Sequence, residues 1–165
     1  MTAHRRHQAS LEFPNPLEIL MTRAFDAPMA LVFDVLWKPE HVRQTFAPFG
    51  EEVTVCSVDL RVGGSYHFVM VTDEGKEMSF HGSFLEIEAP TRTVQTWVYD
   101  GWAGVEAVES MSLDETDRVT TLTYRLVFRD QAGRDHMTKY DGLVANLDNM
   151  EDLLTALLDP QRALS

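Results

Sequence analysis

The side chains whose types could carry chemistry are few in this chain and lie far apart in the sequence. Cys56 is the one cysteine and has no histidine beside it, so it is expected to act as a small strand hydrophobe. His4 and His7 offer at most two ligands, whereas a zinc site needs three or four. The sequence contains no Gly-x-Ser-x-Gly elbow, no phosphate-binding glycine loop and no His-Glu-x-x-His motif. We therefore expect no metal and no cofactor, and binding rather than bond breaking.

Two glutamates and two histidines on predicted strands are further polar candidates. Glu106 and Glu109 have opposite phases of a two-residue period, so they cannot both point into one cavity and at least one is expected in solvent. His67 and His81 are expected on the outer face of neighbouring strands, because the aromatic residues next to them point inward.

Length and charge restrict the classes of protein and partner. The 165 residues suffice for one domain with a sizeable core, and 44% hydrophobic with 24% charged residues is typical of a globular protein. The 26 acidic against 14 basic residues give a net charge of -12, which repels phosphate backbones and anionic lipid surfaces. Neither nucleic acid nor membrane is expected as a partner. The residues after Arg6 form no apolar signal segment and the lone cysteine fits a reducing compartment, so the expected location is cytoplasmic.

The first third of the chain predicts a strand followed by two short helices. Residues 17–25 alternate as a half-buried strand does, and Asp26-Ala27-Pro28 starts a helix over residues 28–36. A second short helix opens at Pro39 and ends before Pro48.

The remainder predicts an antiparallel meander and a long helix. Its strands are rich in β-branched and aromatic residues and are joined by short turns; they are expected at 53–58, 65–71, 77–87, 93–99, 105–113 and 119–128. From about residue 134 the period becomes helical, and one long C-terminal helix is expected to pack one face on the sheet. This order is an α+β arrangement.

A Gly-Gly corner precedes the strand at 65–71. Gly63 and Gly64 allow positive φ or close backbone approach, and Asp59 and Arg61 could pair across the turn. An exposed pair of this kind contributes only about 0–1 kcal/mol, so a structural role is expected for the four residues. Trp37 and Pro39 are likewise expected to belong to a structural motif.

Several ordered pieces of sequence carry a family resemblance. They are Phe25-Asp26-Ala27-Pro28 with Val32-Phe33, Trp37 with Pro39-Glu40-His41, the corner at 59–64, Phe80-His81-Gly82 with Leu85-Glu86-Ile87, and Gly142 within the last helix. Together they resemble the START-related SRPBCC superfamily and, within it, the branch named after the activator of the Hsp90 ATPase. The resemblance implies a helix-grip, Bet v 1-like fold with a curved antiparallel sheet of about six or seven strands. It covers residues 17–158, leaving a mobile tail at 1–16 and a short tail at 159–165.

The resemblance also implies an apolar cavity between the sheet and the long helix. In the family, tryptophans are frequent where this chain has Thr45-Phe46 and Leu143. Because of these differences, the resemblance implies no particular ligand. A filled core is the alternative use of the same large apolar side chains. The candidate lining residues are Tyr66, Phe68, Met70, Met78, Phe80, Leu122, Tyr124 and Leu126 from strands, with Tyr140, Val144 and Leu147 from the helix.

Three functions follow from this resemblance. The leading one is non-catalytic binding of a small, mainly apolar molecule in the cavity, in a stress-related setting. The first alternative is a co-chaperone that activates an Hsp90-type ATPase, with that chaperone as its partner. The second is a cyclase or dehydratase that uses Tyr124 or Tyr140 in the same cavity. A homodimer is left open.

Overall fold

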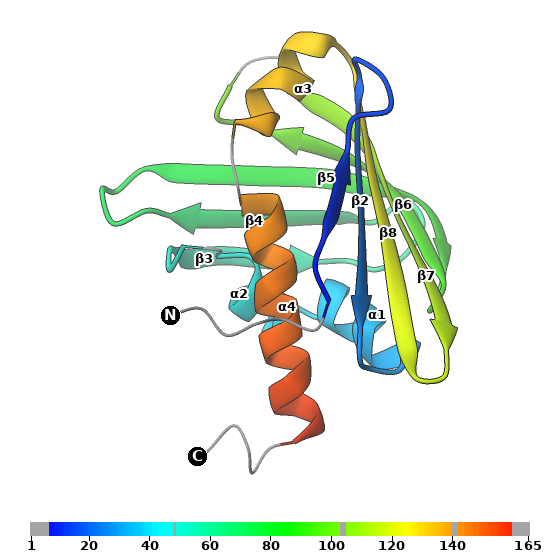
Figure 1. Ribbon diagram of the computed structural model, residues 1–165. Coiled ribbons are helices and arrows are strands. Elements are labelled where there is room, and N and C mark those ends of the chain that lie inside the picture. The colour runs from blue at the N-terminus through cyan, green and yellow to red at the C-terminus, as the bar shows by residue number, and fades with distance from the viewer. Residues whose placement is uncertain (1–6, 48, 103–104, 140–141, 160–165) are drawn as a thin grey trace.

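The computed structural model describes residues 7–47, 49–102, 105–139 and 142–159. Within these residues an antiparallel sheet of eight strands curves around the C-terminal helix α4 (Gly142–Leu158), as Figure 1 shows. The strands are β1 (Ser10–Glu12), β2 (Glu18–Phe25), β3 (Glu52–Val58), β4 (Ser65–Val71), β5 (Glu77–Glu88), β6 (Arg92–Tyr99), β7 (Glu106–Thr116) and β8 (Val119–Phe128). Their order is β1-β2-β8-β7-β6-β5-β4-β3, so β2 pairs with the last strand of the meander. The predicted α+β helix-grip fold is confirmed.

The sheet has a strand more than expected, because β1 lies inside the segment predicted to be a mobile tail. Leu11 of β1 pairs with Met21 of β2, and the backbone of β1 covers the outer edge of β2. All three β1 residues are exposed, so no hydrophobic alternation marks this strand in the sequence. The prediction for the tail at 1–16 is therefore wrong at residues 10–12, and its residues 1–6, which include His4, lie outside the described part.

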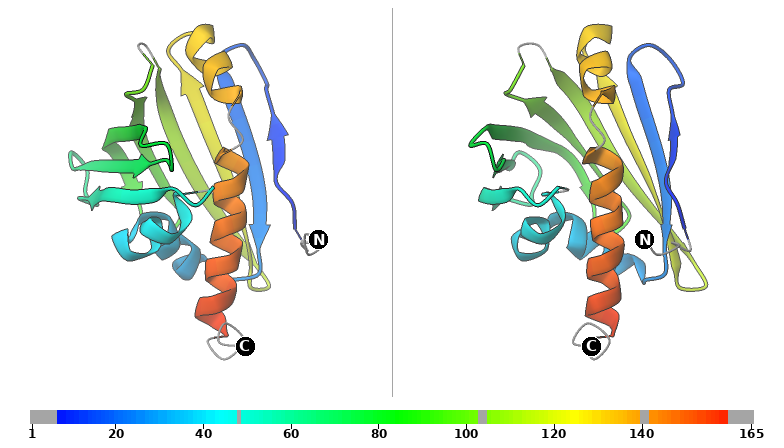
Figure 2. Two further views of the ribbon diagram at one scale, coloured as in Figure 1. Left: turned by 90° about the vertical axis from the view of Figure 1, so that its left-hand side faces the viewer. Right: turned by 60° about the vertical axis from the view of Figure 1, so that its left-hand side comes forward.

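Two short helices, α1 (Met29–Trp37) and α2 (Pro39–Thr45), follow β2 and lie beside α4 at one end of the sheet (Figure 2). Lys38 between them has extended backbone, as the residue before a proline prefers, and Pro39 occupies the first turn of α2. The amide of Asn149 on α4 donates to the carbonyl of Thr45 at 3.2 Å. This bond satisfies a free carbonyl at the end of α2 and fixes α2 against α4.

The predicted long C-terminal helix is confirmed as α4, but its predicted start near residue 134 is wrong, because a separate helix, α3 (Gln131–Thr138), precedes it. Asp130 caps α3 by accepting a 2.8 Å hydrogen bond from the Gly133 amide. Gly142 is the first residue of α4 and not an interior one. The division turns the chain so that α3 covers one end of the sheet while α4 crosses the concave face (Figure 1).

The Gly-Gly corner contains two glycines with different roles. Gly63 has a φ of +84°, a conformation that L side chains rarely adopt. A Cβ atom on Gly64 would lie 2.1 Å from the Asp59 carbonyl oxygen, so Gly64 is needed for close backbone approach. Arg61 Nε lies 2.9 Å from Asp59 Oδ2, and both side chains are exposed.

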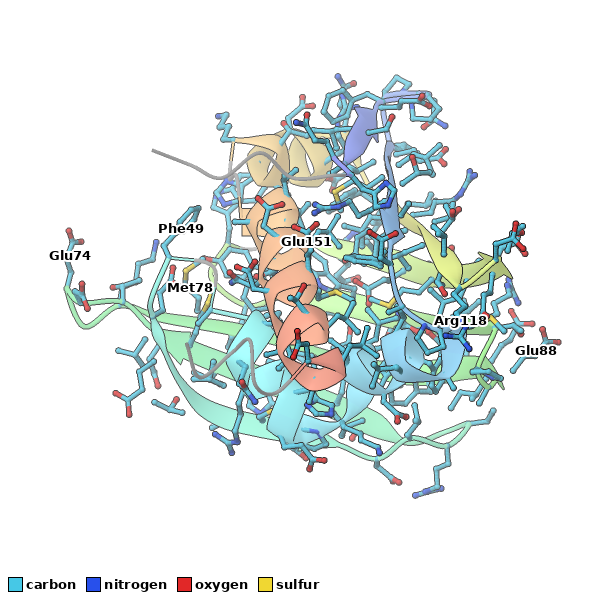
Figure 3. All side chains as sticks on the ribbon, turned by 60° about the horizontal axis from the view of Figure 1, so that its bottom comes forward. Phe49, Glu74, Met78, Glu88, Arg118 and Glu151 are labelled. Atoms are coloured by element: carbon cyan, nitrogen blue, oxygen red, sulfur yellow. The ribbon has the colours of Figure 1, made fainter. Side chains whose placement is uncertain are left out.

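A buried guanidinium joins α4 to the sheet. Arg23 on β2 is 2% exposed, and its Nη1 lies 2.8 Å from Asp148 Oδ1 while its Nη2 lies 3.2 Å from Glu151 Oε2. Figure 3 shows Glu151 on α4 over the middle of the molecule. Glu74 and Glu88, beside the two ends of β5, mark the two opposite margins of the molecule in the same view. The ion pairs thus hold the middle of α4 over the concave face, where the core lies.

Candidate ligand-binding site

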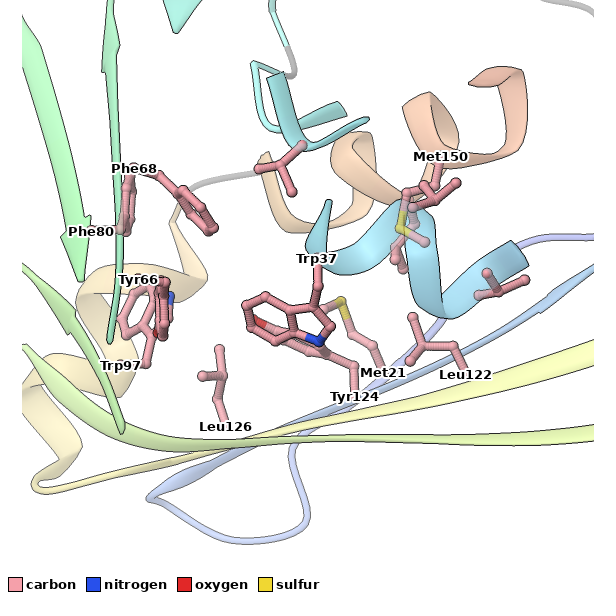
Figure 4. Packing of buried hydrophobic residues seen from close by; sticks show 14 of the residues in the cluster. Met21, Trp37, Tyr66, Phe68, Phe80, Trp97, Leu122, Tyr124, Leu126 and Met150 are labelled. Atoms are coloured by element: carbon pink, nitrogen blue, oxygen red, sulfur yellow. The ribbon is translucent and has the colours of Figure 1, made fainter. Parts of the chain in front are cut away.

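A partly open cavity of about 110 Å³ lies where α1, α2 and α4 meet the concave face of the sheet. Figure 4 shows Trp37 reaching from α1 toward Tyr124 and Met21, with Tyr66, Phe68 and Phe80 to one side and Met150 to the other. The cavity is lined by Met21, Val35, Leu36, Trp37, Val42, Thr45, Phe46, Tyr66, Phe68, Met70, Phe80, Trp97, Glu109, Met111, Leu122, Tyr124, Met137, Gly142, Leu143, Asn146, Leu147 and Met150.

The structure brings most of the candidate lining residues together. Tyr66, Phe68, Met70, Phe80, Leu122, Tyr124 and Leu147 lie on the cavity wall. Their shared position follows from period-2 alternation on the strands, which sends every second side chain to the concave face.

Three of the other four candidates lie elsewhere, and the fourth is not among the described residues. Met78 and Leu126 are buried in the core and do not line this cavity. Val144 lines a second, smaller pocket of about 40 Å³, together with Leu11 and Phe13 from the N-terminal segment. Val144 lies on the side of α4 that faces this N-terminal segment, whereas Leu147 of the same helix faces the main cavity. Tyr140 lies outside the described residues.

Sequence reasoning missed the wall formed by the two short helices. Trp37, assigned above to a structural motif, lines the cavity, is 3% exposed, and has an Nε1 atom without a hydrogen-bond acceptor among the described residues. Val42 and Phe46 complete this wall. Hydrophobic spacing indicated that these helices pack on something, but only the packing itself shows that they face a cavity.

Aromatic rings form a continuous array along one side of the cavity. Trp37 and Tyr66 have ring centroids 5.6 Å apart, and Tyr66 and Phe68 are separated by 5.2 Å. Phe46 lies 5.2 Å from Phe80 in an edge-on arrangement, the geometry that aromatic quadrupoles favour. The methionines of the lining, by contrast, have flexible side chains that adapt to irregular shapes.

A buried carboxylate forms the polar part of the wall. Glu109 on β7 is 3% exposed; its Oε1 accepts a 2.7 Å hydrogen bond from the Gln95 amide, and its Oε2 accepts one from the Tyr124 hydroxyl. Burial raises the pKa of Glu109 to about 6, although the two hydrogen bonds act in the opposite direction. Burial and the neighbouring Glu109 carboxylate raise the pKa of Tyr124 well above its ordinary value, so Tyr124 is a hydrogen-bond donor at neutral pH.

Alternation in the sequence carried the signal for Glu109. It shares a phase with Ala107 and Leu113, which are both buried, whereas Glu106 is exposed and paired with Arg129 at 3.1 Å. The expectation that at least one of the two glutamates is solvated is confirmed. Gln95, which donates a hydrogen bond to Glu109, was not predicted as a site residue, because a polar residue on a strand gives no indication of burial by itself.

The remaining polar candidates lie away from the cavity. His67 and His81 are exposed, as predicted, and belong to a hydrogen-bonded group on the outer face with Ser79 and Asp100. Cys56 is half-buried, with its Sγ 3.6 Å from the Pro39 carbonyl, and burial raises the pKa of its thiol. Such a thiol has little thiolate at neutral pH.

A curved sheet that holds a helix over a largely apolar cavity defines the chain as a helix-grip protein. Residues 26–155 match the family model described as Activator of Hsp90 ATPase homolog 1-like protein. The chain belongs to this family.

Solved structures share the fold over nearly the whole chain. A Rhodobacter sphaeroides protein superposes with a TM-score of 0.82 at 18% identity, over 91% of this chain and 99% of that one. A Nitrosomonas europaea protein gives 0.76 at 25% identity, over 87% and 97%. A Mycobacterium smegmatis protein gives 0.80 at 17%, over 89% and 96%. No curated protein matches the sequence. Among the described residues, no helix combines the length and the hydrophobicity that crossing a membrane requires.

Proposed function

We propose that this protein binds a small, mainly apolar molecule in the cavity between the sheet and α4. The observation that carries the proposal is an unfilled, largely apolar space in the core, bounded by aromatic and methionine side chains. Protein interiors are close-packed, and voids larger than a water molecule are few. An occupant would supply the van der Waals contacts that the side chains lining this space of about 110 Å³ do not find in one another.

The size of the cavity limits the ligand. Sites for drug-sized molecules usually measure about 300–1,000 Å³, whereas an apolar cavity of about 150 Å³ is known to bind benzene. A cavity of about 110 Å³ therefore suits a molecule of about benzene's size, unless the methionines rearrange to enlarge it.

Thermal unfolding in the presence of benzene tests the proposal. Any ligand that binds only the folded state raises the melting temperature, by an amount that grows with its concentration over Kd. We expect such a rise in the wild type, and denaturing mass spectrometry of the freshly purified protein should be run beside it to detect a retained molecule.

Two substitutions on β8 separate cavity filling from general overpacking. Leu122 lines the cavity, whereas Leu126, on the same strand and equally buried, does not. Leu122→Phe places the added ring atoms in the cavity and should abolish the benzene-induced rise. Leu126→Phe should destabilise the protein by about 1–3 kcal/mol but keep the rise. No rise with benzene or other apolar probes of that size in the wild type, together with no retained molecule, refutes the proposal.

The activation of an Hsp90-type ATPase stays a prediction that rests on the family alone. ATPase turnover of the host's Hsp90 homologue, measured with and without the protein, tests it. The cyclase or dehydratase alternative also stays a prediction; Tyr124→Phe should lower the turnover of any substrate found.

A further inference from the structure

Glu109 is the one side chain with a formal charge among the described residues of the cavity wall. The other polar groups there are neutral: Thr45, Asn146, the hydroxyls of Tyr66 and Tyr124, and the indoles of Trp37 and Trp97. The Tyr66 hydroxyl already donates to the Thr96 carbonyl at 2.7 Å. A ligand in this cavity therefore meets a single anionic group in otherwise apolar or neutral surroundings.

The carboxylate of Glu109 has unused capacity to accept hydrogen bonds. An ionised carboxylate offers about four lone-pair positions, and two are occupied by neutral donors, the Gln95 amide and the Tyr124 hydroxyl. No cation among the described residues lies within ion-pair distance of it. Arg23, the buried guanidinium of the same concave face, does not line the cavity and is engaged by Asp148 and Glu151 on α4. A buried carboxylate without a counter-charge is costly, and a cationic ligand would supply one.

The aromatic wall favours the same class of ligand. Five of the rings on the wall belong to Trp37, Tyr66, Phe68, Phe80 and Trp97. A cation within about 6 Å of a ring centroid is attracted by the negative face of the ring, most strongly when water is excluded. The net charge of -12 also attracts cations toward the protein and repels anions.

We propose that the cavity selects a small organic cation, an amine of about six non-hydrogen atoms, whose ammonium group binds Glu109 and whose apolar body packs on the aromatic wall. This inference rests on the proposed function and specifies its ligand class. Tyr124 and Gln95 act as positioning residues, because their hydrogen bonds fix the carboxylate at the cavity surface.

Calorimetric titration with matched probes tests the inference. Cyclopentylamine is a cation at neutral pH, cyclopentanol is a neutral donor of the same shape, and cyclopentanecarboxylate is an anion. At pH 7.5 we expect the wild type to bind the amine about tenfold or more tightly than the alcohol, since a hydrogen bond to a charged group is stronger than one between neutral groups. The anion should not bind.

The variants Glu109→Gln and Glu106→Gln each remove one negative charge from β7. Only the first changes the cavity, because Glu106 is exposed. Glu109→Gln should bind amine and alcohol equally, and Glu106→Gln should keep the wild-type ratio. The wild type provides an independent test, because the amine preference should fall as the pH is lowered through about 6 and Glu109 becomes neutral.

Two results overturn the inference and leave the proposed function standing. One is equal binding of amine and alcohol by the wild type at pH 7.5; the other is an amine preference that survives in Glu109→Gln. If neither these probes nor benzene binds, the proposed function fails as well.

Discussion

Burial of Glu109 gives the protein a pH-dependent stability term whose sign and size can be calculated. The pKa of this group is about 6 in the folded protein, against an ordinary value of 4.5. Between these two values the folded state holds the proton more tightly than the unfolded state. The free energy of unfolding therefore falls as the pH rises from about 4.5 to above 6. At about 1.36 kcal/mol per pH unit, the loss is about 2 kcal/mol.

Glu109→Gln removes this term, because glutamine does not titrate in this range. Urea unfolding at pH 4.5 and pH 7.5 should show that the variant loses about 2 kcal/mol less stability between the two pH values than the wild type does. Comparing changes with pH cancels the contributions of the other carboxyl groups and any constant cost of the new amide. Glu106→Gln, an exposed position on the same strand, is the control and should keep the wild-type change.

An identical change with pH in the wild type and Glu109→Gln would refute the account of Glu109 as a desolvated carboxylate. A larger loss in the variant would give the opposite sign and would mean that a positive charge near Glu109 compensates for burial.

Three further predictions test the scaffold. Gly64→Ala should lower the free energy of unfolding by more than Gly75→Ala. A Cβ atom on Gly64 would lie 2.1 Å from backbone, whereas one on Gly75 would have no atom within 4 Å and only the positive φ would be unfavourable. Equal losses in urea titrations of the two variants would contradict this prediction. Arg23→Met should lower the free energy of unfolding by about 1–3 kcal/mol. This is less than the loss for a fully buried ion pair, because the two acidic partners on α4 are partly exposed. An unchanged urea midpoint would contradict a stabilising role of these ion pairs. Asp130→Ala removes the cap of α3 and should lower the free energy of unfolding by about 1 kcal/mol. Asp130→Asn keeps an accepting oxygen and should lower it by less. If thermal unfolding shows Asp130→Asn to be the less stable variant, capping is not the reason.

The elements of this protein could be predicted because their signals are local. Alternation and turn residues predicted β4 and β8 at their observed ends, and proline positions predicted the starts of α1 and α2 within one residue. The signals failed where structure depends on distant segments. β1 exists because β2 offers it a free edge, and the division between α3 and α4 interrupts an apolar period that continues through it.

The sequence by itself determined which side chains face inward, since the pleat of a strand requires that Tyr66, Phe68 and Tyr124 share one side of the sheet. Only the tertiary structure decided which of those inward residues border a space and which fill the core, as the difference between Leu122 and Leu126 shows. The tertiary structure also decided that Glu109 contacts Gln95 and Tyr124 on the two neighbouring strands. The physical reason is that strand register and helix packing, and not local sequence, set the distances between side chains far apart in the chain.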